Sequence, residues 1–140
     1  MGLIVTLPSN FSKNIPAIAF IAYIETSTAV SSLNVNTVSQ KNYRGDDITF
    51  MNDPSQVIKV DENPDLANMF EHDIITTDGT TLLGADNKAG VSEIIGTANY
   101  LITHHEIKHE TIKVCFIPDE EVSNGTEKID LKKLDAKYDC

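Results

Sequence analysis

The sequence predicts an α/β fold, with part of a mixed, mostly parallel sheet flanked by helices. Residues 15–24, IPAIAFIAYI, are continuously apolar and rich in isoleucine, which is typical of a strand buried on both faces. Residues 88–103 carry apolar side chains at the spacing of one helix face, and residues 111–117, TIKVCFI, predict a second apolar strand. A helix that links two strands favours a parallel pair with a right-handed crossover.

The two ends of the chain are expected to add a strand and a helix. Residues 1–8, MGLIVTLP, predict a strand because they are mostly apolar and end at a proline. In residues 130–137, DLKKLDAK, the spacing of Leu131 and Leu134 predicts a short helix with both leucines facing inward.

The middle of the chain is more irregular. Residues 26–47 are rich in Ser, Thr and Asn and predict a long loop, and residues 48–73 predict short strands or a helical turn. Residues 74–84 contain Asp78-Gly79 between threonine pairs. That pair predicts a hairpin, because a type I′ turn needs positive φ at both central residues.

Length and charge exclude several classes of partner. The chain has 140 residues, about one domain, and 41% of them are hydrophobic, which is enough to form a core. Its formal net charge of −10 argues against binding nucleic acid or an anionic membrane surface, since both require a cationic face. No apolar run reaches the ~18 residues of a membrane span.

The cysteines and the first residues favour a cytoplasmic protein. Cys115 lies inside an apolar strand and Cys140 is the last residue, so they match neither a zinc-type spacing nor a disulfide framework. The chain also lacks a basic segment followed by an apolar one near its start, which would indicate secretion.

Two acidic clusters are the candidate functional sites. Asp86 lies where the long helix is expected to begin, and its carboxylate there can serve simply as a helix cap. Asp119, Glu120 and Glu121 follow the strand of residues 111–117. In open α/β sheets, functional sites collect beyond the carboxyl ends of strands, so this second cluster is well placed.

Glu120 and Glu121 permit a division of labour. Adjacent residues of an extended chain point in opposite directions, so one carboxylate can hold zinc while the other takes a proton from zinc-bound water. A solvated acidic turn explains the same residues without any chemistry. The histidines do not settle the choice, because the sequence has no HExxH motif and a catalytic zinc needs three protein ligands.

Several motifs together resemble one enzyme family. They are IPAIAFIAYIETS, NYRGDDI, ITTDGTTLLGADNKAG and FIPDEEV, and the match runs over nearly the whole chain. On these motifs the chain resembles the peptidase T family of tripeptide aminopeptidases, within the M20 di-zinc metallopeptidases. The combination of the last two motifs is far more specific than either acidic cluster alone.

The resemblance implies a role for each acidic residue. It implies a catalytic domain that binds two zinc ions and short peptides, with Asp86 bridging the metals and Glu121 as a zinc ligand. It implies that Glu120 is the general base. It also implies that Glu25 stands where the family has an aspartate that orients the site.

The chain departs from the family pattern at the metal site. Where the family has His-Val-Asp-Thr, this chain has Tyr23-Ile24-Glu25-Thr26, so a phenol replaces a zinc-binding histidine. A phenol with a pKa of about 10 is a poor ligand near neutral pH. Glu25 is one methylene longer than the aspartate that it replaces. Weak or absent zinc binding is therefore expected, with Tyr23 as a doubtful metal position.

The resemblance also implies that residues 1–140 are only part of the M20-type catalytic domain. On this comparison the N-terminal helical part, the dimerisation domain and the C-terminal part are absent, and further metal ligands with them. The leading hypothesis is therefore a zinc aminopeptidase fragment that is inactive as an isolated chain. The alternatives are a non-catalytic module that binds divalent metal or peptide, and a decayed, truncated gene product.

Overall fold

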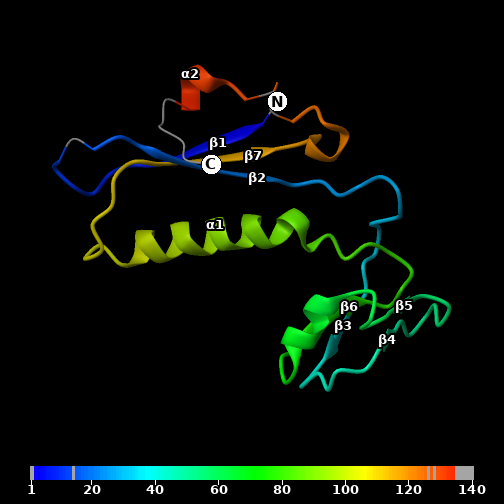
Figure 1. Ribbon diagram of the computed structural model, residues 1–140. Coiled ribbons are helices and arrows are strands. Elements are labelled where there is room, and N and C mark those ends of the chain that lie inside the picture. The colour runs from blue at the N-terminus through cyan, green and yellow to red at the C-terminus, as the bar shows by residue number, and fades with distance from the viewer. Residues whose placement is uncertain (1, 14, 126, 128, 135–140) are drawn as a thin grey trace. The chain divides into compact units, whose positions relative to one another are not determined.

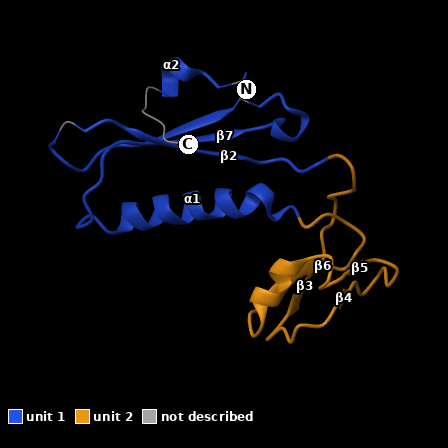
Figure 2. Ribbon diagram, viewed as in Figure 1, with its two compact units in different colours: residues 1–27, 84–140 blue, residues 28–83 orange. Residues whose placement is uncertain are grey.

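The computed structural model describes residues 2–13, 15–125, 127 and 129–134. It divides into two compact units (Figures 1 and 2): unit 1 comprises residues 1–27 and 84–140, and unit 2 comprises residues 28–83. Unit 2 is therefore inserted between two segments of unit 1. Among the described residues, no helix is both long and apolar enough to cross a membrane.

Unit 1 is built on a three-stranded mixed sheet, which confirms the predicted α/β class. Its order is β1 (Leu3–Leu7), β7 (Ile112–Ile117) and β2 (Ile18–Tyr23). The central strand β7 runs antiparallel to β1 and parallel to β2. The expected parallel pair is thus present, with α1 (Ala85–Thr103) and the whole of unit 2 in the connection between its strands.

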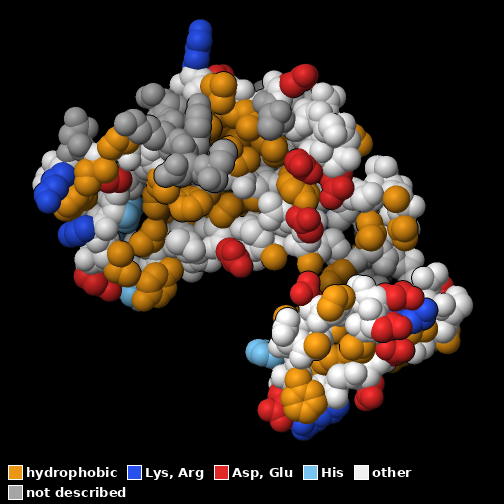
Figure 3. Space-filling view, in the orientation of Figure 1, with side chains coloured by type: hydrophobic (Ala, Val, Ile, Leu, Met, Phe, Trp, Pro, Cys, Tyr) orange, Lys and Arg blue, Asp and Glu red, His pale blue; other side chains and the backbone are white. Residues whose placement is uncertain are grey.

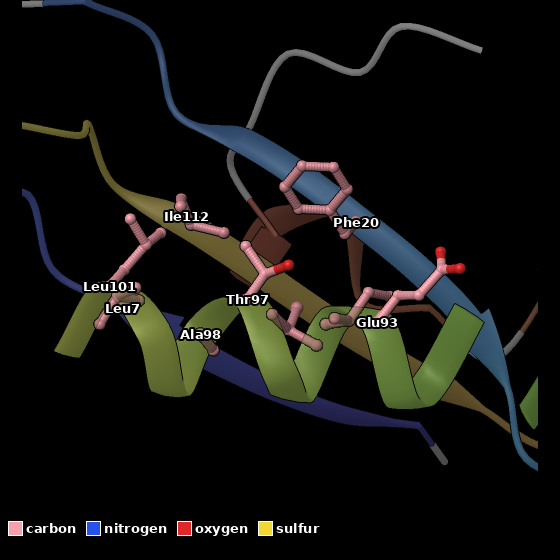
Figure 4. A pocket seen from close by; sticks show the side chains of 9 residues that line it. Leu7, Phe20, Glu93, Thr97, Ala98, Leu101 and Ile112 are labelled. Carbon is pink, nitrogen blue, oxygen red and sulfur yellow. The ribbon is translucent and has the colours of Figure 1, made fainter. Parts of the chain in front are cut away.

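Helix α1 covers one face of this sheet. Alternate residues of the three strands point toward the helix, and Figure 4 shows Leu7, Phe20 and Ile112 facing its side chains Ala98 and Leu101. The helix begins three residues earlier than predicted.

The helix face that packs on the sheet is narrower than predicted. Val91, Ile94, Ala98 and Leu101 are half-buried, whereas Ile95 and Ile102, which were expected on the same face, are 55% and 52% exposed. The apolar stripe formed by the four half-buried residues is enough to cover three strands. Ile95 and Ile102, which flank this stripe, therefore remain largely exposed to solvent.

The opposite face of the sheet carries the buried core of unit 1. Cys115 and Ile117 of β7 pack with Leu134 of α2 (Leu131–Leu134), and partly buried side chains surround them. The inward orientation of Leu134 is confirmed, but Leu131 is 60% exposed and its predicted burial is wrong. The rest of the helix predicted over residues 130–137 lies outside the described residues.

Ile117→Ala is expected to destabilise unit 1 by about 2–4 kcal/mol, because it opens a cavity beside Cys115 and Leu134. Ile117 is only 3% exposed, and β7 pairs on both edges, so the site has little freedom to collapse. Urea denaturation gives the free energy of unfolding. The matched control Ile102→Ala, on the exposed side of α1, should change it by less than about 0.5 kcal/mol. Equal losses in the two variants would contradict the assigned core.

The prediction that residues 15–24 form a strand buried on both faces is wrong in its burial. Ile18, Phe20 and Ile21 of β2 are each more than 40% exposed. The reason is position: β2 is an edge strand of the described sheet, so nothing described pairs with its outer side. Exposed apolar side chains are conspicuous on the surface of unit 1 (Figure 3).

Unit 2 contains two small antiparallel ladders and a short helical segment. Strand β3 (Thr37–Gln40) pairs with β6 (Ile74–Thr77), and β4 (Ile48–Thr49) pairs with β5 (Val57–Ile58). The segment η1 (Pro64–Met69) is a 3-10 helix. The long loop predicted over residues 26–47 thus contains a strand, while short strands and a helical turn over residues 48–73 are confirmed.

The hairpin predicted at Asp78-Gly79 is wrong. Residues 78–84 contain no strand, and β6 pairs with β3 instead. Gly79 has a φ of 100°, but the φ of Asp78 is not positive, so a type I′ turn does not form. The Asp78 carboxylate, which is almost fully buried, instead accepts hydrogen bonds from the side chains of Asn36 and Asn52 and from Thr80.

Candidate functional site

The candidate site lies entirely within unit 1, where β2 ends, β7 ends and α1 begins. The amide of Ile24 donates to the carbonyl of Ile117 at 3.1 Å, so the parallel pairing continues one step past the last residue of β2. This places Glu25 beside the acidic turn that follows Ile117. Sheet topology thus brings together two sequence segments that are about a hundred residues apart.

Asp86 is positioned by the irregular start of α1. Gly84 is the N-cap, with a φ of 72°, and a Cβ at this position would lie 2.7 Å from Cγ2 of Thr26. Glycine is therefore needed both for the backbone angle and for the close approach of the β2 exit. Asp86 has non-helical backbone angles and is not the N-cap. Its Oδ1 atom instead accepts a hydrogen bond from the hydroxyl of Tyr23.

Glu120 and Glu121 lie in η2 (Glu120–Val122), a single 3-10 turn. The expectation of an extended chain here is wrong, because Asp119 has a φ of 67° and turns the backbone directly after β7. The amide of Ser123 donates to the carbonyl of Glu120 at 2.7 Å and closes the turn. Neighbouring residues of a 3-10 helix still diverge by about a third of a turn, so the two carboxylates remain separate.

Glu25 links the three segments. Its Oε1 atom accepts a hydrogen bond from the amide of Glu121 at 3.1 Å, and its carbonyl accepts one from Nζ of Lys88 at 3.3 Å. Its Oε2 atom is buried and has no hydrogen-bond partner among the described residues. Desolvation raises the pKa of this carboxyl, but backbone N–H groups, including those of Glu121 and Glu120, outweigh it and lower the pKa overall.

Tyr23 is hydrogen-bonded to Asp86 and is also influenced by the negative charges of Glu120 and Glu121. The hydrogen bond to Asp86 is the largest cause of a raised pKa at the Tyr23 phenol. Desolvation and the negative charges of Asp86, Glu121 and Glu120 add to it. The phenol therefore stays protonated at neutral pH, which makes it a hydrogen-bond donor rather than an anionic ligand.

The side chains present do not fit a zinc ion. Within residues 2–134 as far as they are described, no three His, Cys, Asp or Glu side chains are grouped closely enough to hold a metal. The phenol of Tyr23 donates to Oδ1 of Asp86 and so occupies one of the acceptor sites that this carboxylate could offer to a metal. His104 is the C-cap of α1, whereas Asp86 lies at its start. The helix has 19 residues and is roughly 28 Å long at 1.5 Å per residue, so His104 is too far away to share a metal with Asp86.

Comparison with curated proteins gives close relatives. Peptidase T of Listeria innocua is 49% identical over 133 residues, which are 95% of this chain and 32% of that protein. Peptidase T of Bacillus subtilis is 47% identical over 133 residues, which are again 95% of this chain and 32% of that protein. The chain resembles part of peptidase T. It spans about a third of the length of these relatives, and no protein-family model matches it.

Solved structures support the same fold for the peptidase T-like chain. Aminopeptidase PepT from Bacillus cereus aligns with a TM-score of 0.67 at 24% identity, over 98% of this chain and 28% of that one. A tripeptidase from Staphylococcus aureus aligns with a TM-score of 0.63 at 20% identity, over 96% and 27%. At these identities the likeness concerns the fold alone.

Sequence reasoning singled out Asp86, Glu120 and Glu121 as candidate site residues but missed the contacts of Tyr23 and Lys88. It treated Tyr23 only as a doubtful metal position in place of a histidine ligand, whereas the structure shows its hydroxyl hydrogen-bonded to Asp86. It also assigned no contact to Lys88, which reaches the carbonyl of Glu25. The only available signal was the position of Tyr23 at the end of a strand that was predicted to be parallel to the strand before Glu120.

Proposed function

We propose that this chain is part of the catalytic domain of a peptidase T-type aminopeptidase, an enzyme that releases the N-terminal residue of tripeptides. The observation that carries the proposal is identity of 47–49% to peptidase T over 95% of the chain. The hydrogen bond between Tyr23 and Asp86 supports it, because it holds an acidic group at the carboxyl end of a parallel strand pair.

In this proposal each acidic residue keeps the role that the family resemblance implies. Glu120, exposed in its turn, takes a proton from the water that attacks the peptide carbonyl. Glu25, held by the amide of Glu121, positions the turn that carries Glu120. Asp86 and Glu121 are the metal-facing carboxylates of the family, although they form no group of three potential ligands among the described residues.

The proposal extends to the setting of the enzyme. It places the protein in the cytoplasm, with short peptides as partners and two zinc ions as the cofactor of the complete family enzyme. It treats the helical N-terminal part, the dimerisation domain and the C-terminal part of the family as absent from residues 1–140. The isolated chain is then a fragment that binds zinc weakly or not at all.

The isolated chain is expected to hydrolyse no tripeptide, with or without added zinc, because its donor set does not hold a metal. The positive test is a chimera in which the 133 aligned residues of this chain replace the matching third of Bacillus subtilis peptidase T. The Tyr23→His chimera should turn over a tripeptide at least ~100-fold faster than the Tyr23 chimera, since a ligand is restored. Release of the N-terminal amino acid is measured by chromatography.

Two outcomes would count against this function. Turnover by the isolated chain would contradict the inactivity of the fragment. A Tyr23→His chimera that folds, as judged by circular dichroism, but shows no turnover would contradict the functional relationship to peptidase T.

A further inference from the structure

Three direct hydrogen bonds hold the candidate site together. The Tyr23 hydroxyl joins the end of β2 to Asp86 at the start of α1. The carboxylate of Glu25 joins the β2 exit to the amide of Glu121 in η2, and Lys88 of α1 reaches the carbonyl of Glu25. These contacts connect every segment that contributes to the site, and each is made between protein groups.

The hydroxyl of Tyr23 competes directly with a metal for Asp86. The hydroxyl donates into one of the roughly four lone-pair sites of this carboxylate, on Oδ1, and so reduces the acceptor capacity that Asp86 has left for a cation. The other nearby donors, Glu120 and Glu121, are both exposed in their own turn and do not group with Asp86 as a ligand set. In a metalloenzyme a shared ion connects such segments, and binding it contributes to folding.

We propose that the Tyr23 hydroxyl takes the place of a metal ion as the link between the end of β2 and the start of α1, so that this chain holds its acidic site together without zinc. The inference rests on the proposed function only because the relationship to peptidase T assigns the metal ligands. It concerns the stability of the chain, and its test involves no catalysis.

The first part of the test is thermal unfolding of the full chain with chelator and with zinc. The melting temperature of the wild-type chain should be the same in both. Tyr23→Phe should lower it by a few degrees, because the link to Asp86 is lost. The control Tyr100→Phe removes a hydroxyl from an exposed tyrosine near the other end of α1 and should leave the melting temperature unchanged.

The second part is a gain of metal dependence. Tyr23→His should melt a few degrees lower than the wild-type chain in chelator and recover with zinc, because an imidazole can bind the metal that the phenol excludes. Adding Asp86→Asn to Tyr23→His should remove this recovery, which separates the site from the histidines elsewhere on the chain.

Either of two results would overturn the proposal. One is a wild-type melting temperature that falls in chelator and rises with zinc. The other is a Tyr23→Phe variant that folds and melts at the wild-type temperature or, where Tyr23→Phe does not fold, a Tyr23→His variant that does not respond to zinc. If Tyr23→Phe fails to fold, the wild-type and Tyr23→His titrations still decide. Failure of the proposed function would appear separately, as an inactive chimera.

Discussion

Glu120→Gln is expected to reduce tripeptide hydrolysis by the Tyr23→His chimera by roughly 10²- to 10⁴-fold in kcat, the usual contribution of a general base. The amide keeps the size of the side chain but cannot take a proton from water. Glu120 lies in a turn that is closed by a hydrogen bond from the amide of Ser123 to the carbonyl of Glu120. The substitution at the side chain should therefore leave the backbone in place. Initial rates at saturating tripeptide measure the effect.

The matched control for Glu120 is Glu106→Gln. Glu106 is also an exposed glutamate of unit 1, but it lies beyond the C-terminal end of α1. It should keep the full rate of the Tyr23→His chimera. If Glu120→Gln kept more than about a tenth of that rate, Glu120 would not be the base.

Asp78→Ala is expected to unfold unit 2 while leaving the sheet of unit 1 intact. The carboxylate of Asp78, 4% exposed, accepts hydrogen bonds from the side chains of Asn36 and Asn52 at 3.1 and 2.9 Å, and from Thr80. Its removal leaves several donors without an acceptor in the interior of a small unit. Loss of amide-exchange protection in β3 and β6, with protection retained in β7, would be the measured result.

The same residue gives unit 2 a dependence on pH. Hydrogen bonds, first among them that from the Thr80 side chain, lower the pKa of Asp78 from 3.8 to about 2. Because the folded pKa lies below the unfolded one, the stabilisation is complete above pH 3.8 and is lost as the pH falls toward 2.

The control for Asp78→Ala is Asp61→Ala, at an exposed site of unit 2. Its amide protection should match that of the wild type. Protection that is unchanged in Asp78→Ala would contradict the assignment.

Local sequence patterns were sufficient for most elements of the fold. The apolar runs that contain β1, β2 and β7 and the helical spacing of α1 depend on neighbouring residues, so they are visible in one sequence. The exposure of β2 was not visible, because an apolar run does not reveal whether a strand lies at the centre or the edge of a sheet. The hairpin prediction at Asp78-Gly79 failed for a related reason. The buried carboxylate of Asp78 accepts hydrogen bonds from residues distant in sequence, and local turn rules do not include such contacts.

The sequence singled out candidate site residues, but it did not reveal their contacts. Asp86, Glu120 and Glu121 were singled out by motif, and the structure joins Asp86 to Tyr23 and the amide of Glu121 to Glu25, while their roles stay predictions. The bond between Tyr23 and Asp86 joins residues 63 positions apart and depends on how α1 returns to the sheet. Whether the phenol of Tyr23 makes a stabilising contact depends on the tertiary structure. Composition and residue spacing do not contain that information.

The central position of β7 determines the order in which the protein can be assembled during synthesis. Leu3 pairs with Phe116 and Ile18 with Ile112, so both outer strands leave the ribosome long before the strand on which they dock. Until then the apolar segments of β1 and β2 have no partner in this sheet. Formation of this sheet is accordingly expected to be slow and to wait until β7 has been translated.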